Sequence, residues 1–239
     1  MIHFRNMSKQ TELAELAACR AEPVPLKGFN KFTQLPYGLE IKHIHAAMHN
    51  FTEFLGFINL ELNSKEIERL ESMLMPANFS SIVGEFMTAN IPKYCTKLAK
   101  NQHHNGHPDI LVKGMFLNDA VQHADEGIEV KASRYLRGWQ GHNPEDTWLM
   151  VFAFDSNRPT DLLKQIAPKP FKFLAVVGAR LTKADWRFAG RSETSRRTIT
   201  ASVTSSGYDK MMANWIYKAP DITSTEAEVL LDPAPVESA

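Results

Sequence analysis

The sequence predicts an α/β protein whose core runs in the order helix, three strands, helix, strand. Three observations lead to this prediction. Apolar residues recur at three- and four-residue spacing in the first part of the chain, as they do in amphipathic helices. Four apolar runs of strand length follow, over residues 109–116, 127–133, 148–154 and 171–178. One segment between the last two runs, residues 160–167, has helical spacing and is bracketed by Pro159 and Pro168.

Helices are expected in an N-terminal region comprising residues 1–78. Residues 11–20 predict a short helix, and apolar positions at helical spacing predict two more, over 44–58 and 67–74. Pro76 is expected to end the last of these helices. Residues 21–42 are punctuated by Pro and Gly and give no assignment.

The core and its basic extension are expected to span residues 79–218. The first core helix covers residues 80–91, because Ser80 is a favourable N-cap and Pro92 cannot continue a helix. Beyond the four strands, residues 198–204 alternate hydroxyl and apolar side chains like a half-exposed strand, and residues 208–217 have helical spacing. Residues 219–239 contain acidic side chains but no Lys or Arg, and they predict a mobile acidic tail.

Composition and charge narrow the function classes. The 239 residues carry 27 basic and 27 acidic side chains, which excludes a uniformly basic nucleic-acid coat. Residues 164–218 nevertheless hold eleven Lys and Arg against three acidic residues. Two cysteines are too few for a disulfide framework and suit a reducing, cytoplasmic compartment. Because no apolar run approaches the roughly 20 residues that span a bilayer, we expect no membrane association.

The residues with the clearest chemistry are Pro108-Asp109 and, on the next predicted strand, Glu129-Val130-Lys131. Glu129 and Lys131 stand two apart on a strand, so both side chains project from one face while Val130 points into the core. Carboxylate oxygens suit Mg²⁺, which links protein carboxylates to substrate phosphates. The pattern indicates a divalent-metal site at the ends of two adjacent strands, beside a lysine that orients a water molecule.

These two motifs and the predicted order of elements resemble the PD-(D/E)XK nuclease superfamily, which includes type II restriction endonucleases and also repair and recombination enzymes. The resemblance covers roughly residues 80–180. It implies that Asp109 and Glu129 bind Mg²⁺, that the Val130 carbonyl is a third ligand, and that Lys131 orients the attacking water. Glu85 is expected to join this site, because many members carry an acidic residue on the helix before the first core strand.

Polar and aromatic side chains on the Gly-punctuated loop after Lys131 are suited to phosphates and base edges. The residues expected to contact DNA from this loop are Arg134, Arg137, Gln140 and Asn143. The alternative is a solvated loop anchored by Trp139. The pair Arg196-Arg197 is also expected to contact DNA, the alternative being a basic edge strand that resists aggregation.

Histidines cluster at residues 43, 45 and 49 and again at 103, 104 and 107. His45 and His49 have the spacing of a zinc-protease helix, but Ala46 occupies the position that such a helix gives to Glu. No paired-cysteine spacing supports a zinc site that includes Cys95. We therefore expect the second cluster to be part of a polar loop near DNA.

The resemblance and these residues together predict a Mg²⁺-dependent endonuclease that hydrolyses double-stranded DNA and leaves 5′-phosphate ends. The enzyme is expected to be a sequence-specific type II restriction endonuclease that acts as a homodimer, with the basic block over residues 164–218 supplying the local positive field. The alternatives are a structure-selective or repair nuclease of the same fold, a DNA-binding protein without catalysis, and an interaction domain unrelated to nucleic acid.

Overall fold

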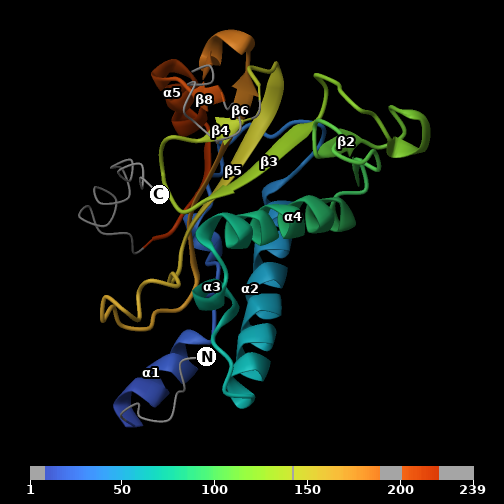
Figure 1. Cartoon of the computed structure of the whole chain (residues 1–239). Helices are drawn as coiled ribbons and strands as arrows, with labels where there is room; N and C mark the ends of the chain where they lie inside the picture. The colour runs from blue at the N-terminus through green and yellow to red at the C-terminus, as the bar shows by residue number, and fades with distance from the viewer. Residues whose placement is uncertain (1–8, 142, 189–200, 221–239) are drawn as a thin grey trace.

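The structure is a computed structural model that describes residues 9–141, 143–188 and 201–220 as a mixed α/β fold (Figure 1). The α-helices are α1 (Lys9–Ala18), α2 (Ile41–Ser64), α3 (Leu70–Met73), α4 (Pro76–Tyr94) and α5 (Ser205–Ala213). The strands are β1 (Leu98–Lys100), β2 (Ile110–Val112), β3 (Ile128–Ser133), β4 (Gln140–Gly141), β5 (Thr147–Asp155), β6 (Lys172–Leu181), β7 (Trp186–Phe188), β8 (Ala201–Val203) and β9 (Trp215–Lys218). The predicted α/β class is confirmed, since the chain combines several helices with a mixed sheet.

Six strands form the main sheet in the order β1-β2-β3-β5-β6-β9. β3 and β5 are parallel, with Glu129 opposite Leu149 and Lys131 opposite Val151, and the other neighbours in this sheet are antiparallel. Parallel neighbours need a crossover connection, and residues 134–146 supply it. β4 lies within this crossover and pairs with β8, which pairs with β7 to complete a second, three-stranded sheet.

β5 divides the interior into two hydrophobic clusters because its successive side chains point to opposite faces. Trp148, Met150 and Phe152 belong to a helix-side cluster that includes buried residues of α2 and α4, the two helices that Figure 1 shows next to each other. Leu149 and Val151 belong to a small-sheet cluster that includes residues of β8 and α5. A strand buried on both faces explains the near-continuous apolar run at residues 148–154.

A buried charge network connects the N-terminal helices to the loop after β5. Arg69 is 2% exposed, and its guanidinium donates to Glu71 at 2.7 Å, to the Asn157 side chain at 2.8 Å and to Glu15 on α1 at 2.9 Å. Asn59 on α2 donates to Glu71 at 2.9 Å. A buried guanidinium needs such partners, because an unpaired charge away from water is strongly unfavourable.

The four predicted strand positions are occupied by β2, β3, β5 and β6, although β2 is shorter than the predicted 109–116. The structure adds β1, which pairs with β2 through Leu98↔Val112 and Lys100↔Ile110. The strand predicted over 198–204 corresponds to β8 where the structure describes it, and residues 198–200 lie outside the described residues.

The helix predicted over residues 160–167 is wrong, and so the second helix of the predicted core order is missing. This segment forms turns instead, with Gln165 at a left-handed φ of 54° and the Ile166 N–H donating to the Asp161 carbonyl. The Asp161 carboxylate also accepts the Arg158 N–H at 2.9 Å. Among the described residues the predicted apolar face is left uncovered, since Leu162 is 54% and Leu163 is 77% exposed. Short helices depend on such packing.

Two other helix boundaries differ from the prediction. Pro76 does not end a helix but occupies the first turn of α4, where its missing N–H is not needed, and Pro92 lies inside the last turn of that helix. The helix predicted over 208–217 ends at Ala213, after which β9 pairs with β6. The Tyr217 side chain is buried, with 1% exposed, and its ring contacts the Phe29 ring.

The predicted regions 1–78 and 79–218 share the helix-side cluster, which contains Phe51 of α2 and Phe79 of α4 together with Phe152 of β5. The residues on the two sides of the predicted boundary at residue 78 therefore pack into one hydrophobic core. Most of the tail, residues 221–239, lies outside the described residues. Within the described part of the chain, no helix is both long enough and apolar enough to cross a membrane.

Candidate functional site

A cavity of about 1310 Å³ opens between α4, the loops over residues 101–107 and 121–123, and β3. The four side chains predicted to carry chemistry, Asp109, Glu129, Lys131 and Glu85, all line this cavity. The main sheet accounts for this convergence, because β2 and β3 are antiparallel neighbours with Ile110 opposite Ile128. Asp109, just before β2, therefore lies across from Glu129, at the start of β3.

Asp109 is held by the backbone of the neighbouring strand. Its Oδ2 accepts the Val130 N–H at 2.8 Å. Burial, followed by the charge of the nearby Glu129 carboxylate, raises the pKa of Asp109 from 3.8 to about 7. Gly127 lets the backbone before β3 approach Ile110 of β2 closely. It has a φ of +142°, and a Cβ there would lie 2.5 Å from the Ile110 carbonyl oxygen.

Glu129 and Lys131 project from the same face of β3 into the cavity and form an ion pair with each other, while Ile128 and Val130 are buried in the helix-side cluster. Burial alone would raise the pKa of Glu129, but the hydrogen bond from His107 and the charge of Lys131 outweigh it and lower the pKa to about 2. Burial would lower the pKa of Lys131, yet the charges of Glu129 and Asp109 raise it above its ordinary value. Lys131 is therefore a cation in this site.

Sequence reasoning did not assign His107 and Glu145 to this site. His107 Nδ1 donates to Glu129 Oε2 at 3.0 Å and lies 3.3 Å from Glu145 Oε2. Burial opposes protonation of His107, but the hydrogen bond to Glu129 and the carboxylate charges raise its pKa overall. The signal available in the sequence was the position of His107, directly before Pro108-Asp109. Glu145 lies near the end of the crossover and has no motif around it.

Glu85 lies at the rim of the cavity rather than among the buried carboxylates. Its side chain is 70% exposed and pairs with Lys100 Nζ at 3.1 Å. Its charge contributes to raising the pKa of Asp109, although it is the smallest of the contributions named there. Glu85 therefore acts on the site electrostatically, and its direct participation in metal binding stays a prediction, as does that of the Val130 carbonyl.

The residues predicted to contact DNA lie in different surroundings. Arg134 is 6% exposed, its Nη1 donates to the Ser156 carbonyl at 2.8 Å, and its guanidinium lies over the rings of Phe79 and Phe154. Burial, together with Arg158, lowers its pKa to about 10. The Arg134 side chain packs in the interior and is not part of the proposed DNA-binding surface.

The other predicted DNA contacts fall into three groups. Arg137 and Gln140 are exposed on the crossover loop, and the Arg137 guanidinium lies over the Tyr208 ring. Asn143 is exposed and lines the same cavity as Asp109. Arg196 and Arg197 lie outside the described residues. Trp139 is buried in the small-sheet cluster and donates to the Tyr135 carbonyl at 3.0 Å, which is the anchoring role considered for it.

Comparison of the chain with protein-family models, with curated proteins and with solved structures finds no significant match in any of the three.

Proposed function

We propose that this protein is a Mg²⁺-dependent endonuclease that hydrolyses phosphodiester bonds of duplex DNA. The observation that carries the proposal is the convergence of Asp109, Glu129 and Lys131 on one cavity wall. Burial and the charge of the nearby Glu129 carboxylate together raise the pKa of Asp109 to about 7, and the half-buried Lys131 ammonium pairs with Glu129 beside it. Carboxylates concentrated in this way suit a hard divalent cation that also meets substrate phosphate.

The donor set fits Mg²⁺. Asp109 and Glu129 would hold the ion, because a divalent cation offsets both the burial and the mutual repulsion that disfavour two ionised carboxylates at this position. When bound, Mg²⁺ polarises the phosphate and lowers the pKa of a coordinated water molecule.

The side chains of the protein have separable tasks in this proposal. Lys131 is a cation, so it donates hydrogen bonds to a water molecule or a phosphate oxygen and does not act as the general base. His107 keeps Glu129 ionised and fixes its carboxylate by the 3.0 Å hydrogen bond. The Val130 N–H fixes Asp109 in the same way. Positioning of charged groups in a partly buried site is the main source of rate enhancement in phosphoryl transfer.

The direct experiment is incubation of the purified protein with a plasmid of mixed sequence and Mg²⁺, followed by sequencing of the product ends. We expect cleavage with 5′-phosphate ends in the wild type and no cleavage in Asp109→Asn, which should still bind DNA in Ca²⁺. Discrete bands would favour a sequence-specific restriction enzyme acting as a dimer, and cleavage only at junctions, ends or lesions would favour a repair nuclease. Full activity in Asp109→Asn would refute the site assignment.

A further inference from the structure

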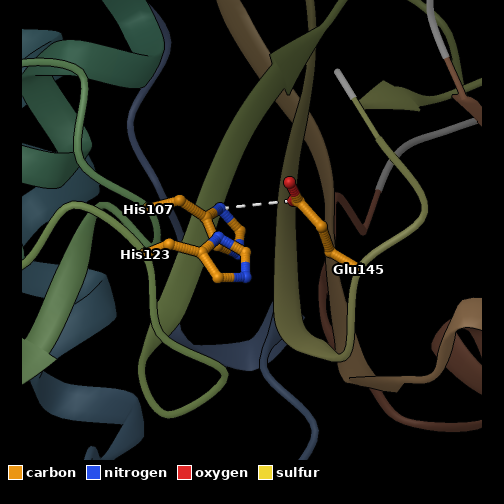
Figure 2. A group of neighbouring side chains, drawn as sticks. All are labelled: His107, His123 and Glu145. Atoms are coloured by element: carbon orange, nitrogen blue, oxygen red, sulfur yellow. Dashed lines mark ion pairs between the residues drawn. The ribbon is translucent and has the colours of Figure 1, made fainter.

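His107 and His123 come from two loops that the backbone holds side by side. The backbone N–H of His107 donates to the Gln122 carbonyl at 3.0 Å, and the backbone N–H of Ala124 donates to the His107 carbonyl at 2.9 Å. As a result the two imidazole rings are nearly parallel, with centroids 5.3 Å apart (Figure 2). Neither ring orientation depends on a helix or an extended strand.

Asn101 locks these two loops together from behind. It is 7% exposed, its Nδ2 donates to the Pro108 and Val121 carbonyls at 3.0 and 2.9 Å, and its Oδ1 accepts the Val121 N–H at 3.1 Å. Gly106 is required beside it, because a Cβ there would lie 2.5 Å from both the Asn101 Nδ2 and the Val121 oxygen. The histidines are therefore carried by a rigid support.

Glu145 completes the group from a third segment. Figure 2 shows its carboxylate directed at His107 from the chain that leads into β5. One ligand atom from each of His107, His123 and Glu145 lies within 4.8 Å of the other two. Ligands of a tetrahedral metal with bonds of about 2.0–2.1 Å stand somewhat closer than this. His123 can supply the difference, because its side chain is 61% exposed and its contact with Asp125 Oδ1 is long, at 4.0 Å.

The hydrogen bonds of His107 leave one ring nitrogen available. A carboxylate accepts hydrogen bonds, so His107 Nδ1 carries the proton that it shares with Glu129. In the neutral ring Nε2 then has a lone pair, and this atom is buried with no hydrogen-bond partner among the described residues. Glu145 Oε2 lies 3.3 Å from Nδ1 in this structure, so its side chain must turn to share an ion bound at Nε2. A histidine oriented by a carboxylate through one nitrogen, with the other left open, is the usual arrangement of a metal ligand.

We propose that His107, His123 and Glu145 form a second metal site, which takes a divalent transition ion of the Zn²⁺ class and lies beside the carboxylates proposed to hold Mg²⁺. Two imidazoles and one carboxylate make a donor set that prefers transition metals over Mg²⁺, which prefers oxygen ligands alone. Three protein ligands leave a coordination position open to water or to a ligand atom from outside the protein. The site shares His107 with the nuclease proposal, in which that residue holds Glu129, but it uses neither Asp109 nor Lys131, so its metal binding can be tested without DNA cleavage.

The test is titration of the chelator-treated full-length protein with Zn²⁺ in a large excess of Mg²⁺, together with the absorption spectrum of the Co²⁺ form. We expect one Zn²⁺ per chain that Mg²⁺ does not displace, and Co²⁺ bands typical of low coordination number. His123→Ala and Glu145→Gln should weaken Zn²⁺ binding by more than the 10- to 100-fold that loss of an outer-shell partner costs. His123 is exposed, so its removal should leave the fold intact.

Two further variants decide between explanations. His104→Ala removes an exposed histidine from the same loop region and should bind Zn²⁺ like the wild type. Asp109→Asn should also keep Zn²⁺ even where it abolishes DNA cleavage, so failure of the nuclease proposal and failure of this one give different results. Displacement of Zn²⁺ by Mg²⁺, or wild-type binding by His123→Ala, would overturn the proposal. Loss of Zn²⁺ in Asp109→Asn alone would place the ion at the carboxylate pair and overturn it as well.

Discussion

Asp109→Asn should make the metal-free protein more stable at neutral and alkaline pH, at the expense of the proposed activity. The folded protein raises the pKa of Asp109 from 3.8 to about 7, so the fold favours the neutral carboxyl over the ionised one. At one pKa unit per roughly 1.4 kcal/mol, ionised Asp109 lowers the free energy of unfolding by up to about 4 kcal/mol. Asparagine keeps the acceptor for the Val130 N–H and is never charged.

The sign and the pH window follow from the same shift. Below about pH 3 the carboxyl is neutral in both the folded and the unfolded chain, so the two proteins should be equally stable. Between about pH 3 and 7 the unfolded chain releases its proton first, and wild-type stability falls relative to the variant. Above pH 7 the full difference should be present.

Urea unfolding in the presence of a chelator, from about pH 4 to 9, measures this difference. Asp125→Asn, which changes an exposed carboxylate with a side-chain accessibility of 58%, is the matched control and should give a curve parallel to the wild type. Added Mg²⁺ should stabilise the wild type and leave Asp109→Asn unchanged. A stability difference that does not vary with pH, or a wild type more stable than the variant at pH 8, would refute the reasoning.

Three further outcomes are expected. Lys131→Ala should slow DNA cleavage at least about 100-fold in single-turnover assays while DNA binding in Ca²⁺ persists, and an unchanged rate would remove Lys131 from the mechanism. Arg69→Met leaves the fully buried Glu71 unpaired and should lower the urea-unfolding free energy by about 3–5 kcal/mol; a loss under 1 kcal/mol would mean that the pair is dispensable. Arg137→Ala should flatten the salt dependence of DNA binding by about one unit, whereas Lys27→Ala, exposed in the N-terminal region, should match the wild type.

The sequence predicted the part of the site that depends on strand periodicity. Glu129 and Lys131 share a face because strands alternate. Asp109 joins them because β2 and β3 are antiparallel with Ile110 opposite Ile128, a register that places Asp109 across from Glu129. His107 and Glu145 reach the site through loops, and neither spacing nor composition specifies how a loop folds back. Asn101, which holds those loops in place, is one polar residue among many in the sequence.

The error at residues 160–167 has a related cause. Helical spacing of Leu162, Leu163 and Ile166 shows that a helix would be amphipathic, but it does not show that a surface exists to cover its apolar face. In the structure these side chains are exposed, and the Asp161 carboxylate bonds to the backbone N–H of Arg158 and stabilises a turn. A local preference for turns therefore prevailed where tertiary packing offered no support.

The alternating side chains of β5 bear on how the molecule unfolds. Because Met150 completes the helix-side cluster and Val151 the small-sheet cluster, neither cluster can dissolve while the other keeps its shape. Heat should therefore melt both in a single cooperative transition, and truncating either side chain should lower the same midpoint. The two halves of the interior form one thermodynamic unit, so an ion bound in the cavity on one side should also protect amides of β8 and α5 on the other from hydrogen exchange by global unfolding.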